Sequence, residues 1–368
     1  MVHGIDGLSD IYDEWRNLVE QLPHAHYNQH PDWYMAYLEV LQPDIGKVCF
    51  VTARQQGQLV GVLPLMRALR GDARLPLGLR IRRAELAHDT GIYTTDMVVV
   101  DVEQAPSIWQ AISHSLQNTN WGWDVFYVNH GVLPQGHLHA ALVDQPNVVL
   151  TQQERCWLVE LAPWAQIEAR LKRRFRQNLR RSRRLLEKVG AVRAVWVTNP
   201  ADIASAFEQF VAMELASWKG QTETAKPGYP PPAAIGLEAW KQAFYLQVLE
   251  RFAERGVTQI LQLYAGDRLV GTRLSLQLGS TEYLVKSTKD EQLDNAIGVG
   301  HLMIEELIKR CEAQNLSGSV ITELNCQTGY SWFEPWATSS ASYVNVCAYN
   351  STLAGRAAAL VRWVRGIE

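Results

Sequence analysis

The residues with the greatest capacity for chemistry form a short run, Asn295-Ala296-Ile297-Gly298-Val299-Gly300, directly before a helical pattern. Gly298 and Gly300 have no side chain, so their backbone N–H groups can come close to a ligand. The helical pattern, from Val299 to Gln314, directs the positive end of its dipole to the same point. Backbone N–H groups and a helix N-terminus together make a site for an anion, most often a phosphate. The run therefore predicts a binding site for a cofactor that carries a pyrophosphate.

Composition narrows the range of partners. The chain has 368 residues, 47% of them hydrophobic, and a net charge of −3. The length favours about two domains, and the charge argues against a general nucleic-acid or membrane-surface binder. The five cysteines form no C-x-x-C pair and no Cys/His spacing suggests zinc, so we expect a cytoplasmic protein without a metal. We expect neither a signal peptide nor a stretch long enough to span a bilayer.

Strand-like runs surround the glycine run and its helix. Thr258–Tyr264, Arg268–Leu278 and Glu282–Ser287 precede it and alternate with tight turns, and Val320–Leu324 follows the helix. Turns this short join antiparallel neighbours. We therefore expect a mostly antiparallel sheet that presents the glycine run at one of its ends.

A hairpin pattern occurs twice in the chain. Ala53–Gly61 and Leu263–Gly271 each contain a strand, a glycine-containing turn and the tripeptide Leu-Val-Gly, and each is followed by a strand and a helix. This succession favours an internal duplication over a chance likeness of two hairpins. In the first copy the turn that corresponds to the glycine run is Asp101–Pro106, which has two carboxylates and no glycine. Carboxylates there would repel a phosphate, so we expect one cofactor site, in the C-terminal half.

A strongly basic segment lies in the middle of the chain, with ten basic residues and one acid between Arg170 and Lys188. We expect one helix over residues 163–189. Its apolar side carries Leu171, Phe175, Leu179 and Leu186, and its opposite side Arg173, Arg176, Arg180 and Arg184. A solvated face is one interpretation. Binding of a phosphate or polyanion through bidentate contacts, with Arg173 and Arg180 foremost, is the other.

In this setting the chain resembles the GCN5-related N-acetyltransferase (GNAT) superfamily. More narrowly, it resembles the double-domain bacterial branch around cellulose and exopolysaccharide biosynthesis, which is related to the Fem peptidyltransferases. Asn295-x-x-Gly298-x-Gly300 resembles the acyl-CoA signature Gln/Arg-x-x-Gly-x-Gly/Ala and departs from it at Asn295. Further matches, in the branch's order, are Pro31-Asp32-Trp33, Gly61–Leu65, Arg173–Arg184, Ser217-Trp218-Lys219-Gly220, and Asn325 to Tyr330 with Trp332-Phe333.

The resemblance implies an α/β fold (α+β) of two tandem GNAT-like domains, each a mixed, mostly antiparallel sheet flanked by helices. Residues 1–160 would form a degenerate N-terminal domain. Residues 161–368, including the arginine-rich linker helix 163–189, would form the acyl-CoA-binding domain. The implied enzyme is an N-acyltransferase that moves an acyl group from acetyl-CoA or another acyl-CoA to an amine or hydroxyl. An amino sugar or a polysaccharide or lipid precursor would be the acceptor.

The resemblance also implies roles for particular residues. Coenzyme A would be held by Asn295, Ile297, Gly298, Val299, Gly300 and His301, and the backbone of Glu282–Ser287 would polarise the thioester carbonyl. Tyr330 would be the general acid, unless it is only a half-buried aromatic. By residue type and position, candidates for the base are Glu323, Glu282, Asp290 and Asp294, with Glu323 and Glu282 foremost, because Asp290 and Asp294 are expected to shape the turn. Trp218 and Lys219 open a proline-rich loop. Trp218 would either anchor this loop in the core or form a wall of the acceptor site, where Lys219, Arg173 and Arg180 would be the other contacts.

Two other functions stay open on the sequence. A Fem-like transferase would take aminoacyl groups from charged tRNA and use the arginine helix as its RNA contact. A non-catalytic binding or scaffold protein of a polysaccharide export system would retain the fold without the chemistry.

Overall fold

The protein consists of two compact units. A computed structural model gives its structure and describes residues 1–22, 25–41, 48–67, 73–74, 80–86, 96–117, 119, 121–132, 136–221 and 233–365. One unit is Met1–Cys156 together with Ala341–Glu368, and the other is Trp157–Ser340. This differs from the division expected at residues 160 and 161, because the C-terminal segment belongs with the N-terminal unit.

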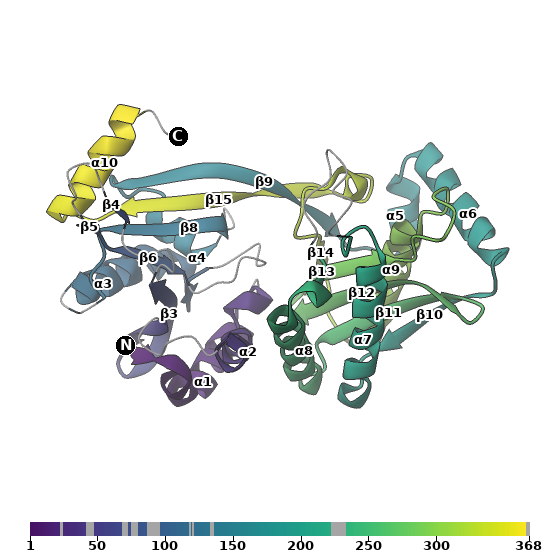
Figure 1. Cartoon of the computed structure of the whole chain (residues 1–368), viewed down its shortest axis with the longest axis horizontal. Helices are drawn as coiled ribbons and strands as arrows, with labels where there is room; N and C mark the ends of the chain where they lie inside the picture. The colour runs from purple at the N-terminus through teal and green to yellow at the C-terminus, as the bar shows by residue number, and fades with distance from the viewer. Residues whose placement is uncertain are drawn as a thin grey trace. The chain divides into compact units, whose positions relative to one another are not determined.

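The first unit is a sheet with helices packed on it (Figure 1). Its strands are β1 (Val2–His3), β2 (Val48–Gln55), β3 (Gln58–Arg67), β6 (Arg83–Leu86), β7 (Val98–Val99), β8 (Val125–Val132) and β15 (Ser339–Tyr349), with a separate pair β4 (Ala73–Arg74) and β5 (Arg80–Ile81). Its helices are α1 (Gly4–Glu20), α2 (Pro31–Leu41), α3 (Ala105–Gln117), α4 (His137–Leu142) and α10 (Leu353–Arg365), with short 3-10 helices at Tyr27–Gln29 and Val102–Gln104. The main strands follow the order β1-β2-β3-β6-β8-β15, and β7 pairs with β3.

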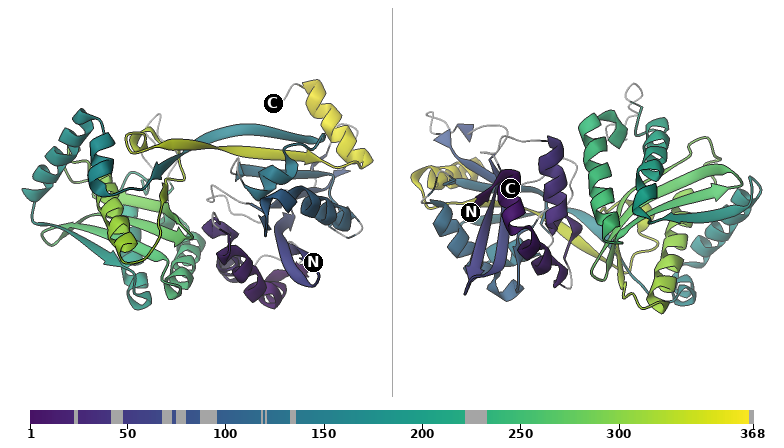
Figure 2. Two further views of the ribbon diagram at one scale, coloured as in Figure 1. Left: turned by 180° about the vertical axis from the view of Figure 1, so that it is seen from behind. Right: turned by 90° about the horizontal axis from the view of Figure 1, so that it is seen from below.

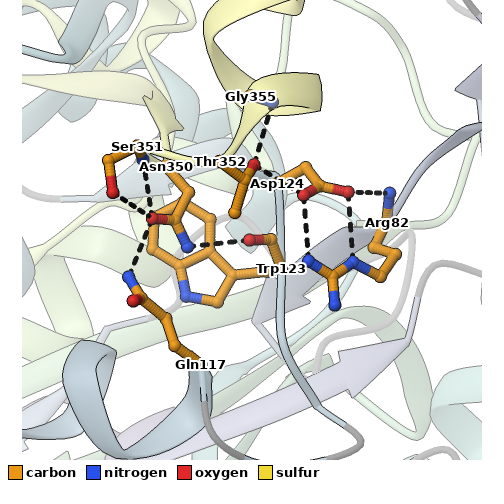
Figure 3. Close-up of polar contacts among 8 residues, drawn as sticks. All are labelled: Arg82, Gln117, Trp123, Asp124, Asn350, Ser351, Thr352 and Gly355. Atoms are coloured by element: carbon orange, nitrogen blue, oxygen red, sulfur yellow. Dashed lines mark hydrogen bonds and ion pairs between the residues drawn. The ribbon is translucent and has the colours of Figure 1, made fainter. Parts of the chain in front are cut away.

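Polar contacts hold the C-terminal segment in this first unit (Figure 3). Asn350 donates its side-chain N–H to the carbonyl oxygen of Trp123 at 2.8 Å. The hydroxyl of Thr352 donates to Asp124 Oδ1 at 2.7 Å, and Asp124 also accepts from Nε and Nη2 of Arg82 at 3.2 and 3.0 Å. These bonds pair the buried side chains of Asp124 and Asn350, which would be costly to leave unpaired, and they attach the residues after β15 to the N-terminal part of the chain.

The second unit has one sheet between two layers of helices. Its strands are the end of β9 (Val148–Glu160), β10 (Val192–Val197), β11 (Thr258–Ala265), β12 (Arg268–Leu278), β13 (Thr281–Lys289) and β14 (Glu323–Asn325), in the order β9-β14-β13-β12-β11-β10. Its helices are α5 (Trp164–Arg170), α6 (Arg173–Glu187), α7 (Pro200–Ala216), α8 (Ala239–Glu254) and α9 (Val299–Leu316), with 3-10 turns at Ile235–Leu237 and Ser331–Phe333. Figure 2 shows α7 and α8 on one face of this sheet and α6 and α9 on the other.

The repeated hairpin is reproduced in detail. In β2–β3 the pairing register shifts between Ala53 and Arg54, and in β11–β12 it shifts between Leu263 and Tyr264, the corresponding residues. The glycine of each Leu-Val-Gly lies under the helix that follows. A Cβ on Gly61 would be 3.0 Å from a side-chain atom of α3, and one on Gly271 would be 2.7 Å from a side-chain atom of α9. The two units therefore share a hairpin, a bulge and a close helix contact, as a duplication predicts.

The strands that follow each hairpin have the same connectivity. In the first unit β6 is parallel to β8, and in the second β13 is parallel to β14, with a helix between the two strands in each case. The strand on the other side of this parallel pair comes, in each unit, from a distant part of the chain. β14 pairs on its other side with the end of β9, and β8 pairs with β15. The neighbour of β14 is thus β9, which comes after the helices α3 and α4 of the first unit in the sequence. The neighbour of β8 is β15, which comes after helix α9 of the second unit.

The single basic helix expected over residues 163–189 is wrong. The chain forms α5 and α6 with an extended break at Leu171 and Lys172, whose ψ angles are 141° and 138°. No glycine or proline marks this break. Leu171 is buried in the core beside Leu179, and the change in backbone direction lets both residues pack there. Tertiary packing has overridden helix propensity, as it commonly does.

Other predicted elements are confirmed in kind with shifted ends. The strand expected at Val320–Leu324 is β14, which starts later. The C-terminal helix α10 was not predicted. In the first unit, the N–H of Glu103 is capped by the carboxylate of Asp101 at 3.0 Å, so a side chain of the protein occupies the turn where a phosphate would bind.

Candidate functional site

The glycine turn before α9 is held by side chains on both sides of it. Ile297 and Val299 are buried in the core of the second unit. The carboxylate of Asp294 accepts the N–H of Ala296 at 2.8 Å, and its carbonyl accepts the N–H of Ile297 at 2.9 Å. Asp294 therefore shapes the turn, as its residue type predicts. Asn295, the residue that departs from the acyl-CoA signature, is exposed at the surface.

The N–H groups of the turn are not equally available to a ligand. The N–H of Gly298 donates to the hydroxyl of Ser182 on α6 at 3.1 Å, and that of Val299 donates to the carbonyl of Ile297 at 2.9 Å. Within the described residues, Gly300 and His301 form no such bond with their N–H groups. Because the first turn of a helix cannot satisfy its own N–H groups, these two are the donors that an anion would meet.

The two glycines serve different contacts. A Cβ on Gly298 would lie 3.3 Å from Ser182 Oγ and 3.3 Å from His301 Cδ2, which is tighter than ordinary packing. A Cβ on Gly300 would lie 3.6 Å from the ring of Trp332, an ordinary contact distance. Gly298 therefore allows α6 to approach α9, while Gly300 faces the loop that contains Trp332.

His301 is enclosed by aromatic rings. Its Nδ1 accepts from the indole N–H of Trp336 at 3.1 Å. The ring stands edge-on to Phe175 and to Trp332, with centroids 5.0 and 5.6 Å away. Burial, and then the charge of Arg273, lower the pKa of His301 to about 4. The imidazole is therefore neutral at pH 7 and brings no positive charge to a phosphate, while the backbone N–H of His301 lies in the first turn of α9.

The parallel strands β13 and β14 part next to this turn. They pair only at Thr281–Tyr283 with Glu323–Asn325. Beyond this point β13 runs on to Lys289, and a bulge leaves Val285 without an opposite residue on β12. A bulge redirects backbone groups away from the ladder. The structure thus brings a stretch of β13 without a β14 partner to the same end of the sheet as the N-terminus of α9.

Lys219 reaches this stretch of β13. Its Nζ donates to the carbonyl oxygen of Ser287 at 2.6 Å and lies 3.5 Å from Oε1 of Glu214. Glu214 has no exposed surface, and its other oxygen accepts the N–H of Ile235 at 2.8 Å. Lys286 approaches the same carboxylate at 3.9 Å. Burial lowers the pKa of Lys286, and the charges of Lys219 and Lys241 act in the same direction, against that of Glu214.

The other residues predicted to contact the acceptor lie on α6 and at the start of the proline-rich loop. Trp218 is half-buried at the end of the described part of the loop, and the proline-rich segment 222–232 lies outside the described residues. Arg173 is exposed on the first turn of α6. Arg180 is exposed and paired with Glu168 through Nη2 at 2.8 Å. The apolar side of α6 packs as predicted, through Leu179 and Leu186.

Tyr330 lies in the loop that follows β14, on the side where β13 and β14 part. Its side chain is 52% exposed. Its backbone is fixed, because the carbonyl accepts the indole N–H of Trp157 at 3.1 Å and the N–H of Phe333 at 3.0 Å. The geometry leaves the phenol accessible to a ligand, which is compatible with an acid role.

The two candidate bases lie at the opposite end of the sheet. Glu282 has no exposed surface; Gln259 donates to it at 3.2 Å, and it interacts electrostatically with Arg310 in the C-terminal half of α9. Ten residues of helix separate Arg310 from Gly300, or about 15 Å. Glu323 is the first residue of β14 and lies opposite Thr281. The structure does not bring either carboxylate to the glycine turn.

Two residues of the site were missed from the sequence. Ser182 caps Gly298 and is the only small residue in the arginine run; its spacing from Leu179 and Leu186 places it on the packing side. Arg273 is 1% exposed on β12 and lies on the face of the sheet that α9 covers, as Gly271 does. A charged residue two positions after a glycine that packs under a helix was the signal for it.

Comparisons with known proteins identify a family that matches the part of the chain containing the glycine turn. Residues 173–319 match the family described as acetyltransferase (GNAT) domain. No curated protein matches the chain. No helix in the described parts of the chain is long and apolar enough to cross a membrane, and no cluster of metal-binding side chains occurs there.

Solved structures share the fold over nearly the whole chain. The C-terminal domain of a putative lysylphosphatidylglycerol synthetase from Agrobacterium fabrum is 10% identical, with a TM-score of 0.55 over 97% of this chain and 96% of that one. FemX is 9% identical, with a TM-score of 0.55 over 90% and 96%. L-PGS from Bacillus licheniformis is 11% identical, with a TM-score of 0.50 over 86% and 89%. At identities this low, the structural likeness shows a common fold and no more.

Proposed function

We propose that this chain, a double-domain relative of FemX in fold that carries a GNAT domain over residues 173–319, is an N-acyltransferase. It takes an acetyl or other acyl group from acyl-CoA and transfers it to an amine, or to a hydroxyl, of an acceptor such as an amino sugar or a polysaccharide or lipid precursor. The pyrophosphate binds at the N-terminus of α9, and the thioester lies along the stretch of β13 that β14 does not pair with.

The observation that carries this proposal is the availability of two donors beside that stretch. The N–H groups of Gly300 and His301 lie in the first turn of a long helix, where the dipole favours negative charge. The backbone of β13 past its bulge supplies an N–H for the oxygen on which charge develops during acyl transfer. Tyr330 donates a proton to the leaving thiolate, and the resulting tyrosinate regains, through solvent, the proton that the attacking amine loses. Glu282, with no exposed surface, does not reach a bound acceptor in this geometry.

Gly300→Pro tests the cofactor site. Proline removes one donor N–H at a position where the helix does not need it and is tolerated in a first turn. Gly300→Ala is the matched control, because it keeps the N–H and its Cβ fits 3.6 Å from Trp332. We expect calorimetry with acetyl-CoA to show at least about tenfold weaker binding for the proline variant, the loss of one charge-assisted hydrogen bond, and little change for alanine.

The outcome that contradicts the proposal is equally direct. Absence of binding by the wild type, or equal affinity of all three proteins, removes the cofactor site from α9. Mass spectrometry of amine acceptors incubated with acetyl-CoA then distinguishes a transferase from a protein that only binds the cofactor.

A second candidate function is aminoacyl transfer from charged tRNA. The exposed arginines of α6 favour it. Arg173, Arg174, Arg181 and Arg184 are all exposed, and no acidic residue lies among them on the helix. A phosphate backbone would neutralise them, and binding would then fall steeply with salt. A tRNA shift assay between low and physiological salt tests this, and a flat salt response excludes it.

A further inference from the structure

Arg273 is a buried cation that the fold does not neutralise. Its side chain is 1% exposed, and its Nε and Nη2 have no hydrogen-bond partner. Burial lowers the pKa of Arg273 to about 10, so the guanidinium is still charged at neutral pH. No described carboxylate forms an ion pair with it. An unpaired buried charge is among the most costly features a fold can retain, which calls for a compensating use.

The position of Arg273 indicates where that use lies. On β12 it is opposite Ser287, and Ser287 belongs to the stretch of β13 past Tyr283, where pairing with β14 has ended. The charge of Arg273 acts on His301, in the first turn of α9, and on Cys326, directly after β14. Arg273 therefore pairs through its backbone with this stretch of β13 and interacts electrostatically with α9 and with the residue after β14.

The two unpartnered atoms define the shape of the missing partner. Nε and Nη2 form one edge of the guanidinium, and they donate two parallel hydrogen bonds to an anion with two oxygens. The same chain shows this pairing elsewhere. Arg82 donates from Nε and Nη2 to the two oxygens of Asp124 at 3.2 and 3.0 Å (Figure 3). In Arg273 the same edge is present and the carboxylate is missing.

We propose that Arg273 is an anion-recognition residue, which binds two oxygens of a carboxylate or phosphate group on a ligand that enters between β13 and β14. The group has two possible sources, the phosphates of a nucleotide cofactor or a carboxylate on the transferred acyl group. The proposal assigns a cationic contact that the motif position Asn295 does not supply. It stands independently of acyl transfer, because it concerns a charge already present in the fold.

Arg273→Met tests the proposal without any ligand. Methionine has a similar length and no charge, so removal of an uncompensated charge should raise the melting temperature of the second unit's transition. Arg82→Met is the matched control, because there the same change breaks a formed ion pair and should lower the melting temperature. If Arg273→Met lowers the melting temperature as Arg82→Met does, the arginine has a structural role and the proposal is overturned.

Measurements of ligand binding are the second test of the role of Arg273. Calorimetry with coenzyme A, acetyl-CoA, succinyl-CoA and inorganic pyrophosphate compares wild type with Arg273→Met and Arg273→Lys. If the partner is a phosphate, the methionine variant loses at least about tenfold in affinity for the CoA compounds alike, and lysine, which lacks the fork, recovers part of it. If the partner is an acyl carboxylate, only succinyl-CoA is affected.

The two proposals fail in different ways. Binding of pyrophosphate that depends on Arg273, without binding of any CoA compound, supports the anion site and removes the acyl-CoA function. Affinities unchanged by either Arg273 variant, for every probe that the wild type binds, overturn the anion site and leave the acyl-CoA function in place. Absence of binding of all four probes to the wild type overturns both.

Discussion

Some residues of the glycine turn in the second unit serve packing and others are available to a ligand, and residue type alone does not show which. Gly298 was expected to present its N–H to a cofactor, and the structure gives that N–H to Ser182. His301 was expected among the cofactor-binding residues, and the structure shows its side chain accepting a hydrogen bond from Trp336. The presence of a turn before the helix could be predicted from the sequence, because glycines directly before a helical pattern are typical of such turns. The partner of the Gly298 N–H could not, since it comes from a helix more than a hundred residues away.

Glu282 gives a pH-dependent prediction at this scale. Burial raises the pKa of Glu282 to about 7 from 4.5, so the folded protein holds this proton where the unfolded chain has released it. The folded state then binds more protons, and stability falls as pH rises from 4.5 to 7. Glu282→Gln removes this dependence. We expect the variant to gain about 2–3 kcal/mol over wild type between pH 4.5 and 8, measured by urea unfolding.

The difference between the two proteins, followed across pH, is the quantity that matters, because other groups titrate in both. A wild-type stability that rises over this range relative to Glu282→Gln would show a carboxylate that is ionised and paired in the fold.

At the scale of elements, the repeated hairpin is the best-predicted feature of the chain. The pattern of strand, turn and Leu-Val-Gly anticipated both hairpins, and the structure adds the same bulge in each. The break between α5 and α6 was not predictable from residue type, because the segment contains no glycine or proline. Helix periodicity continues through Leu171, and only the packing of the core ends the helix there. Local pattern predicts elements well where the turn residues are specific.

Gly271 offers a test of the helix contact that the repeat shares. In Gly271→Ala the new Cβ would lie 2.7 Å from a methyl group of Val299 and 3.0 Å from the sulfur of Met303, so α9 must shift. We expect a loss of about 1–2 kcal/mol in denaturant unfolding, since overpacking exceeds the benefit of alanine over glycine.

The equivalent change in the first unit is the matched comparison. Gly61→Ala meets Ile108 at 3.0 Å, where a small movement of one side chain suffices, and should cost less. Equal stability of Gly271→Ala and wild type would mean that α9 is not held against the hairpin by this contact.

At the scale of the whole molecule, the two units do not follow the order of the chain. The sequence predicted two similar domains, and it placed the boundary near residue 160. It gave no sign that the C-terminal strand returns to the first unit, because a strand pattern such as Ser342–Tyr349 does not specify its partner. Pairing over long sequence separation is the part of this fold that local patterns cannot encode. The polar contacts of Asn350 and Thr352 with the first unit are visible only in three dimensions.

Fragments test this organisation. Residues 157–340 contain all the paired positions of the second sheet, including the end of β9 beside β14. We expect this fragment to fold, with cooperative unfolding by circular dichroism and dispersed amide signals by NMR. A fragment of residues 161–368 loses the strand that pairs with β14 and carries β15 without β8, so we expect it to aggregate. A folded, monomeric 161–368 fragment would contradict the assignment of β15 to the first unit.

The pairing of β15 with β8 also determines the order in which the two units can complete their folding during translation. The first sheet needs residues of β15, which the ribosome makes only after the whole second unit. Translation at about 5–20 residues per second leaves the edge of β8 without this neighbour for roughly 10–40 s. The N-terminal unit is therefore the last to be completed, in reverse of the usual order. During that interval the nascent chain carries an open strand edge, a feature that favours pairing with other chains.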